Sequence, residues 1–183
     1  MNDNRRAFLR RSLLATAAVP ALLGPSSVRA IPPISRKRPS HFKLSVAAYS
    51  YRQRLQAKPP KMDMFGFLDL AADLGFDAVE PTSYYFPADA DEAYFARFKR
   101  QAFLAGLDVS GTAIGNNFCV PPGEKRAEQI ALARKWIDRA AWIGAPVIRV
   151  FAGQVPKDST EAAAFGWVIE CFNEVLPHAE ARG

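Results

Sequence analysis

The fold class follows from the stretch Ala140-Ala141-Trp142-Ile143-Gly144-Ala145-Pro146-Val147-Ile148-Arg149-Val150-Phe151. The first residues of this stretch end a predicted helix, the last ones form an apolar run rich in β-branched residues, and Gly144 lies between the two. The same succession of small residues and a glycine occurs three more times in the chain, and its glycines are Gly75, Gly106 and Gly183. We therefore predict a repeated strand–helix unit in which each glycine adopts a left-handed turn after its helix.

The other elements are found by extending this pattern in both directions. Runs rich in β-branched and aromatic residues predict strands over residues 44–51, 76–80, 108–114 and 146–151. Apolar residues at helical spacing predict helices over 63–74, 91–105 and 124–143, and Asp158-Ser159-Thr160-Glu161 is typical of a capping box that opens a fourth helix. We expect Pro177 to kink or end this helix, and its inward side chains to be Phe165, Val168, Phe172 and Leu176.

The spacing of these elements indicates a barrel. Strands that begin near residues 44, 76, 108 and 146 define units of about 32 to 38 residues, the length of a strand with its crossover helix. Eight such units would need about 286 residues, which is within the range of a (βα)8 barrel. Four units leave one face of a parallel sheet bare, whereas such sheets are normally covered on both faces. We therefore predict an α/β fold that is the N-terminal half of a TIM barrel, about four βα units, truncated before strand five.

A small doubly wound sheet, complete at four strands, is the alternative fold. Such folds carry a glycine-rich phosphate loop after the first strand, where this chain has Tyr49-Ser50-Tyr51-Arg52-Gln53. The absence of that loop favours the half barrel. A half barrel expressed alone would be insoluble or would associate, as a homo-oligomer for example, through its bare face and unpaired strand edges.

The basic character of the chain belongs to its N-terminal tail. Of the net charge of +6, residues 1–30 contribute +4 and Arg36-Lys37-Arg38 contribute +3, so residues 41–183 carry −1. A nearly neutral body argues against nucleic acid as a partner. Two cysteines in 183 residues exclude a disulfide scaffold.

The tail has the order of an export signal. Asn4-Arg5-Arg6-Ala7-Phe8-Leu9-Arg10 resembles a twin-arginine motif, residues 12–24 are apolar but too short to span a bilayer, and Val28-Arg29-Ala30 is typical of a signal-peptidase site. We expect a signal peptide over 1–30, a proline-containing linker over 31–40 and the partial barrel over 41–183. The twin-arginine translocase would then be a transient partner, and the protein would be periplasmic or otherwise extracytoplasmic. A basic signal for the general export route is the alternative.

Candidate site residues are taken from the C-terminal ends of the strands, where parallel barrels place their chemistry. Five side chains at or just beyond these ends could contact a substrate, and they are Tyr49, Tyr51, Glu80, Asn116 and Arg149. Glu80 and Arg149 could instead form a structural ion pair, and Asn116 could be a turn former. The set is rich in groups that bind hydroxyls but has one carboxylate and no histidine, so no metal ligands or catalytic residues are assigned from it.

Three segments in register resemble the sugar phosphate isomerase/epimerase family, whose barrels are xylose isomerase-like. They are Leu44-Ser45-Val46-Ala47-Ala48-Tyr49-Ser50-Tyr51-Arg52, then Leu74-Gly75-Phe76-Asp77-Ala78-Val79-Glu80 leading into Thr82-Ser83-Tyr84-Tyr85-Phe86-Pro87, and Gly144-Ala145-Pro146-Val147-Ile148-Arg149-Val150-Phe151-Ala152-Gly153. The resemblance implies a divalent metal (Mn, Mg, Co or Zn) held by two Glu, an Asp and a His, supplied from strand five onward, beyond Gly183. None of these ligands is expected in this chain.

The resemblance also implies an activity. The full-length protein would be an exported, metal-dependent sugar or sugar phosphate isomerase or epimerase that moves a proton next to a ketose carbonyl, with a small carbohydrate or polyol as its substrate. The 183 residues alone would be inactive. A non-catalytic carbohydrate-binding barrel is the alternative, and an abasic-site endonuclease-like protein, which the neutral body disfavours, is a third hypothesis.

Overall fold

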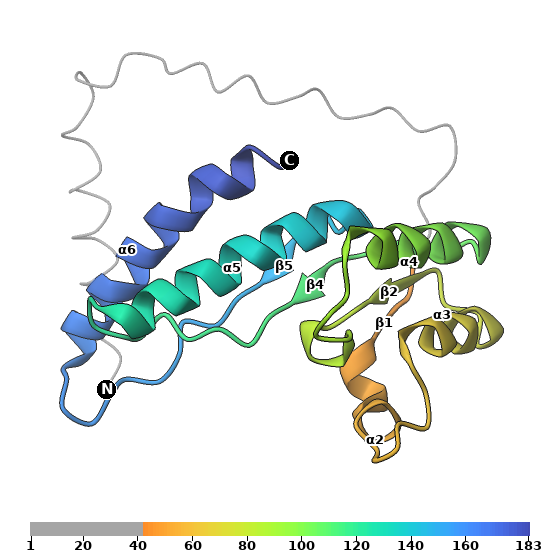
Figure 1. The fold of residues 1–183 in the computed structure, drawn as a ribbon, viewed down its shortest axis with the longest axis horizontal. Helices are drawn as coiled ribbons and strands as arrows, with labels where there is room; N and C mark the ends of the chain where they lie inside the picture. The colour runs from red at the N-terminus through yellow and green to blue at the C-terminus, as the bar shows by residue number, and fades with distance from the viewer. Residues whose placement is uncertain (1–41) are drawn as a thin grey trace, which may run out of the picture. The chain divides into compact units, whose positions relative to one another are not determined.

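A computed structural model describes residues 42–183 of the chain, and the signal peptide and linker predicted from the sequence lie outside the described residues. The helices and strands alternate along the chain (Figure 1). Their bounds are β1 (Ser45–Ala47), η1 (Ala48–Tyr51), α2 (Arg52–Leu55), α3 (Met64–Asp73), β2 (Ala78–Glu80), η2 (Ser83–Tyr85), α4 (Glu92–Leu104), β3 (Asp108–Val109), β4 (Thr112–Ala113), α5 (Glu124–Ile143), β5 (Ile148–Arg149) and α6 (Glu161–Glu180).

All the described strand pairs are parallel, as the repeat predicts. β1 pairs with β2 and β2 with β3, while β4 pairs with β5. β3 and β4 are two parts of the single strand predicted over 108–114, and a parallel bridge between Thr82 and Ala113 joins the two sheets. The offset between partners grows from 30 residues at Ala78 and Asp108 to 31 at Thr82 and Ala113. One extra residue between β3 and β4 therefore interrupts the ladder as a bulge does.

The helix ends follow the sequence signals closely. Side chains of Asp63, Asp91 and Thr160 each accept a hydrogen bond from the backbone N–H three residues later and so cap α3, α4 and α6. The four glycines of the repeat have φ angles between 72° and 83°, and they are Gly75, Gly106, Gly144 and Gly183. The predicted left-handed turns are confirmed, because only glycine adopts this conformation without steric cost.

Three sequence-based expectations are wrong. The first strand does not reach residue 51, because the chain turns into the 3-10 helix η1 at Ala48. Pro177 does not end α6, which continues to Glu180; the helix does without the one backbone hydrogen bond that an N–H at position 177 would donate to the Asn173 carbonyl. The buried face of α6 is also displaced from the predicted stripe: Phe165 is 69% exposed and Leu176 is 48% exposed. Val168 is buried as predicted and Phe172 is partly buried against the core, and the other buried residues of the helix are Ala164, Cys171 and Val175.

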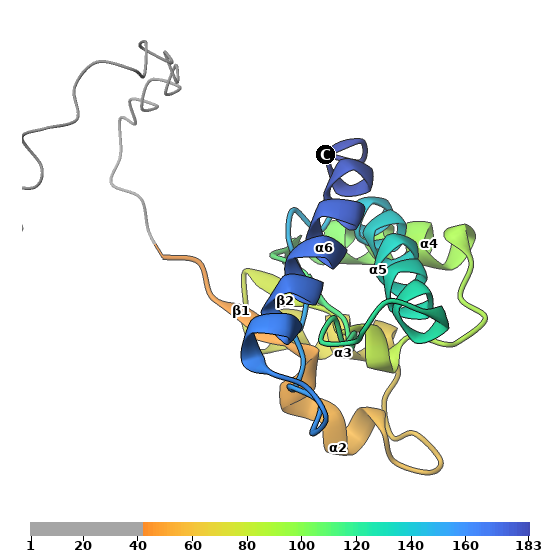
Figure 2. The ribbon, with the colours of Figure 1, turned by 90° about the vertical axis from the view of Figure 1, so that its left-hand side faces the viewer.

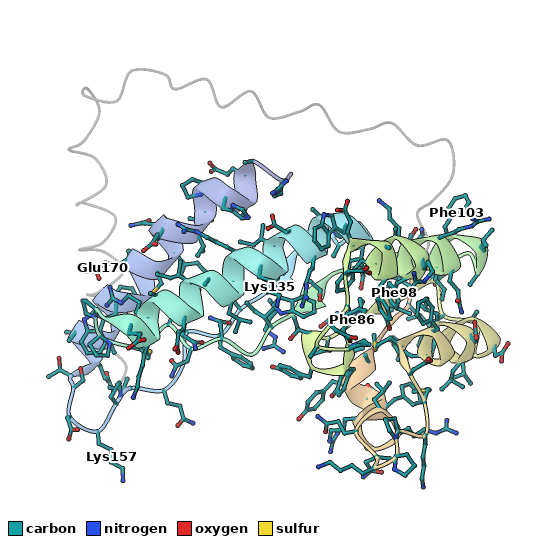
Figure 3. The ribbon with its side chains drawn as sticks, in the orientation of Figure 1. Phe86, Phe98, Phe103, Lys135, Lys157 and Glu170 are labelled. Carbon is teal, nitrogen blue, oxygen red and sulfur yellow. The ribbon has the colours of Figure 1, made fainter. Side chains whose placement is uncertain are left out.

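The helices cover one face of the strands. Alternate strand residues point to opposite faces, and Val46, Val79 and Ile114 point into the core beneath the helices. Phe86 lies in this core, and the centroid of its ring is 5.3 Å from the ring centroid of Phe98 on α4. Figure 3 shows Phe98 inside this cluster and Phe103, on the same helix, pointing away from it. Figures 1 and 2 both show α5 beside α6, with which it packs.

The opposite face of the strands has no covering layer among residues 42–183. Val147 is 63% exposed and Phe151 is 46% exposed, and both follow the alternation that places Arg149 on this side. In a closed (βα)8 barrel this face lines the interior. The partial α/β barrel predicted from the sequence is therefore the observed architecture. Within residues 42–183 we find no helix that combines the length and the apolar character needed to cross a membrane.

Candidate functional site

Two of the predicted site residues, Glu80 and Arg149, point to the uncovered face at the C-terminal ends of the strands. Partners in parallel strands point to the same face of a sheet. Ala47 is the partner of Glu80, Thr82 is the partner of Ala113, and Ala113 is the partner of Arg149. Glu80 and Arg149 therefore share this face with Thr82, and Tyr49 lies in the 3-10 helix η1 that follows β1. The C-terminal edge is where barrel enzymes hold their substrates, so we take these residues as the candidate site.

Arg149 does not pair with Glu80, contrary to one of the two interpretations of the sequence. Its guanidinium carbon lies 4.0 Å from the centroid of the Phe151 ring, which is a cation–π contact, and its Nη1 donates to the Ile114 carbonyl at 3.3 Å. Within the part of the chain that the structure describes, Arg149 takes part in none of the ion pairs. The side chain is exposed on the uncovered face and is held by an aromatic ring and a carbonyl.

The side chain of Asn116 joins two neighbouring strand ends by hydrogen bonds. Its side chain is 4% exposed, its Nδ2 donates to the Phe151 carbonyl at 2.8 Å, and its Oδ1 accepts from the Phe151 N–H at 2.8 Å. This pair of bonds continues the strand ladder beyond Arg149 with a side chain in place of a backbone. The amide predicted to contact substrate is thus engaged with the backbone that carries Phe151, the ring on which Arg149 rests.

The loops after β4 and β5 are joined further along the same edge. The backbone N–H groups of Phe118 and Cys119 both donate to the Ala152 carbonyl at 2.8 Å. Gly153 has φ of +112°, and a Cβ atom built on it would overlap Oδ1 of Asn117, which itself accepts from the Cys119 N–H at 3.0 Å. This close approach requires glycine for its conformation and for its lack of a side chain. The backbone after Arg149 is therefore held by the hydrogen bonds of Asn116 to Phe151 and by those of Phe118 and Cys119 to Ala152.

The first two loops form an aromatic cluster at the other end of the edge. Tyr49 is 52% exposed, and the Arg52 guanidinium lies 5.1 Å from its ring centroid. Tyr85 lies close by; burial, the largest cause, raises the pKa of its phenol, with smaller contributions from Tyr49 and Tyr84. Tyr51, the other predicted tyrosine, instead packs its ring against the core residue Phe67 at 6.0 Å.

Two hydroxyls in the second loop are buried without a hydrogen-bond partner among the described residues. They are Thr82 Oγ1 and Tyr85 Oη. A buried hydroxyl without a partner costs free energy, so such atoms point to a missing acceptor or donor such as water or ligand. Thr82 and Arg52 lie in the segments at the predicted strand ends, but neither is among the five candidate residues. Threonines and arginines in loops are too common for the sequence alone to single them out.

The described residues do not fit a complete metal site. Among residues 42–183 there is no group of three or more His, Cys, Asp or Glu side chains able to hold a metal ion. Glu80 is the one carboxylate at the ends of the predicted strands, and a catalytic metal needs about three protein ligands. We therefore assign no metal-dependent step to these residues.

Comparisons with known proteins agree with this architecture. Residues 68–183 match the family of xylose isomerase-like TIM barrels. A crystal structure of the protein SMc04130 from Sinorhizobium meliloti 1021 superposes with a TM-score of 0.64 at 27% identity, covering 76% of this chain and 47% of that one. Crystal structures of D-psicose 3-epimerase with D-fructose and, from Clostridium cellulolyticum H10, with D-tagatose superpose with a TM-score of 0.64 at 18% and 20% identity, each covering 78% of this chain and 50% of the other.

The chain thus spans about half the length of these solved structures. The comparison with curated proteins gives no match. The match of the family to residues 68–183 covers most of the partial barrel, including β2 to β5 and α3 to α6 in part or in full. The chain therefore belongs to the xylose isomerase-like TIM barrel family.

Proposed function

We propose that the protein is an isomerase or epimerase of a sugar or sugar phosphate and that it moves a proton next to a ketose carbonyl. The observation that carries the proposal is the edge built by Tyr49, Glu80, Thr82 and Arg149 in a chain of this family. Two of the solved structures that share the fold are D-psicose 3-epimerases crystallised with D-fructose and D-tagatose. The sugars in those two crystal structures supply the substrate class of the proposal, a small carbohydrate.

The residues of this chain would bind and orient the sugar. The carboxylate of Glu80 takes part in none of the ion pairs of residues 42–183 and points to the uncovered face, and a carboxylate accepts hydrogen bonds from vicinal hydroxyls well. The exposed ring of Tyr49 offers an aromatic face, against which the C–H side of a sugar can stack. A bound divalent metal would polarise the carbonyl and stabilise the enediolate. Its ligands would come from outside residues 42–183, so we attribute only binding and orientation to this chain.

We also propose that the protein is exported by the twin-arginine route. The support is the order of sequence features in residues 1–30: the paired arginines Arg5 and Arg6, the short apolar run and the small residues at Val28 and Ala30. Replacing both arginines with lysine should retain a precursor of unchanged length in the cytoplasm, and fractionation of cells with an antibody against the barrel measures this. A processed protein outside the cytoplasm despite both replacements would refute the twin-arginine route.

Hydrogen exchange tests the proposed reaction. The protein is purified with whatever residues its gene encodes after Gly183 and is incubated with D-fructose, D-tagatose and their phosphates in deuterated water. Deuterium in the recovered sugar is measured by mass spectrometry, beside the metal content of the protein. Incorporation at one carbon that stops when the metal is chelated is the expected result. Glu80→Gln should weaken sugar binding, whereas Glu128→Gln, an exposed carboxylate on α5, should not. Sugar binding without exchange, in a protein free of metal, would refute the reaction and favour a non-catalytic carbohydrate-binding barrel.

A further inference from the structure

Arg149 has more hydrogen-bonding capacity than the fold uses. A guanidinium carries five N–H donors, and the one protein hydrogen bond of this group is the 3.3 Å bond from Nη1 to Ile114 within residues 42–183. The side chain is exposed on the face that lines the interior of a closed barrel. A positive charge in such a position needs a negative partner or water, because burial of an unpaired charge is costly.

The carboxylates of the described residues do not supply this partner. The ion pairs of arginine or lysine with acidic residues lie elsewhere: one joins Lys43, just before β1, to β3, and the others involve helices α5 and α6 and the residues after α6. Glu80 shares the face, but one strand lies between it and Arg149, and it precedes by two residues Thr82, which is in register with Arg149. Strand geometry therefore places the Cα atoms of Glu80 and Arg149 about 12 Å apart. Ala113 and Thr82 lie between them on this face and are each 1% exposed, so a ligand that contacts both Glu80 and Arg149 would have to span this distance.

The guanidinium is also held in a fixed position. The Phe151 ring supports it at 4.0 Å, and both backbone groups of Phe151 are bound by the buried amide of Asn116 at 2.8 Å. Residues just beyond Phe151 are tied in turn by the two hydrogen bonds to Ala152. A group that is ordered before a ligand arrives loses little conformational entropy on binding. The fold therefore keeps a cation in place at the strand end.

We propose that Arg149 binds an anionic group of the substrate, either a carboxylate or a phosphate, at the end of the sugar away from Glu80. The planar guanidinium matches the oxygen geometry of both groups and can donate two parallel hydrogen bonds to either. This inference rests on the proposed function for the sugar itself. It adds that the preferred substrate is charged, which distinguishes it from neutral ketoses such as D-fructose.

Calorimetric titration with three ketoses of the same length tests the assignment. The probes are D-fructose, D-fructose 6-phosphate and D-fructuronate, which differ in the group at C6. We expect one charged probe to bind at least about tenfold more tightly than D-fructose at low salt, and the probe that does so identifies the anion as phosphate or carboxylate. Arg149→Gln should abolish the preference, Arg149→Lys should keep part of it, and Arg100→Gln, an exposed arginine on α4, should leave it unchanged.

The outcomes separate this assignment from the proposed reaction. Binding is measured without turnover, so an Arg149-dependent preference for the anion in a protein that exchanges no substrate hydrogen supports the assignment and refutes the isomerase. Equal affinity for charged and neutral ketoses, no binding of any probe, or a preference that survives Arg149→Gln would overturn it. Thermal unfolding of each variant shows whether it is folded, and Arg149→Lys gives a second measurement if Arg149→Gln is not.

Discussion

Replacing Asn116 with alanine tests whether the two strand ends depend on a single side chain. The substitution removes the hydrogen bond from Nδ2 to the Phe151 carbonyl and the bond from the Phe151 N–H to Oδ1, both 2.8 Å long. It also leaves these two backbone groups without partners in a part-buried position. We therefore expect a large loss of stability for the removal of one polar side chain.

The expected loss is about 2–4 kcal/mol. Each hydrogen bond contributes about 0.5–1.5 kcal/mol net, and each group left without a partner in the interior costs about 1–3 kcal/mol. The sum of these ranges is reduced because water can reach a part-buried edge and replace some of the bonding. Asn116→Asp should be no more stable than Asn116→Ala, since it keeps the acceptor for the Phe151 N–H but turns a carboxylate oxygen toward the Phe151 carbonyl.

Urea unfolding followed by far-ultraviolet circular dichroism measures these differences. The control is Asn173→Ala, an exposed asparagine on α6, which should change the free energy of unfolding by less than about 0.5 kcal/mol. A loss of less than about 1 kcal/mol for Asn116→Ala, with an unchanged dependence on urea, would refute the reasoning. It would mean that the strand ends are held by the Ala152 hydrogen bonds alone.

Three further predictions concern the backbone and pH dependence. Gly153→Ala should destabilise by about 1–3 kcal/mol, because φ of +112° is strained for alanine and its Cβ would displace Asn117, whereas Gly166→Ala, in open space on α6, should stabilise by about 0.5–1 kcal/mol; chemical unfolding of both variants checks the contrast. Asp91→Ala should cost about 1 kcal/mol, because it removes the bond from the Tyr94 N–H that caps α4, and helix protection in hydrogen exchange should fall there first. Burial raises the pKa of Tyr94 to about 12 from an ordinary value of 10.0, so the unfolded state loses this proton first and the free energy of unfolding should fall between pH 10 and 12. The free energy of unfolding of Tyr94→Phe should fall less steeply over that range, and an identical slope for both proteins would contradict the assignment.

Local signals in the sequence were sufficient for most of the fold. The predicted helix over 124–143 has the observed bounds of α5, and its buried residues include Ile130, Ala133, Ile137 and Ala140 as the periodicity indicates. The left-handed glycines follow from the need to end a helix within one residue. The turn at Ala48 and the displaced face of α6 were not predictable in the same way. Both features depend on which residues from other parts of the chain pack against an apolar side chain in the folded structure.

The sequence predicts where the candidate residues lie in the fold, but not which residues their side chains contact. The rule that parallel strands present chemistry at their C-terminal ends selected Glu80 and Arg149, and the register places both on one face. It could not tell that Arg149 would stack on Phe151, or that Asn116 would bind the backbone of that residue. Contacts between residues about 35 positions apart depend on register across strands, and an extra residue between β3 and β4 shifts that register by one.

The sequence by itself determined the repeated strand–helix unit, the parallel sheet and the ends of the helices. These features depend on periodicity, caps and glycines, which act over a few residues and are therefore written in short stretches such as 140–151. Only the tertiary structure decided that Glu80 and Arg149 stay apart, that Asn116 joins two strand ends and that two hydroxyls in the second loop have no hydrogen-bond partner within residues 42–183. Hydrogen bonding and charge act between atoms a few ångströms apart, and the folded chain alone brings distant residues within that range.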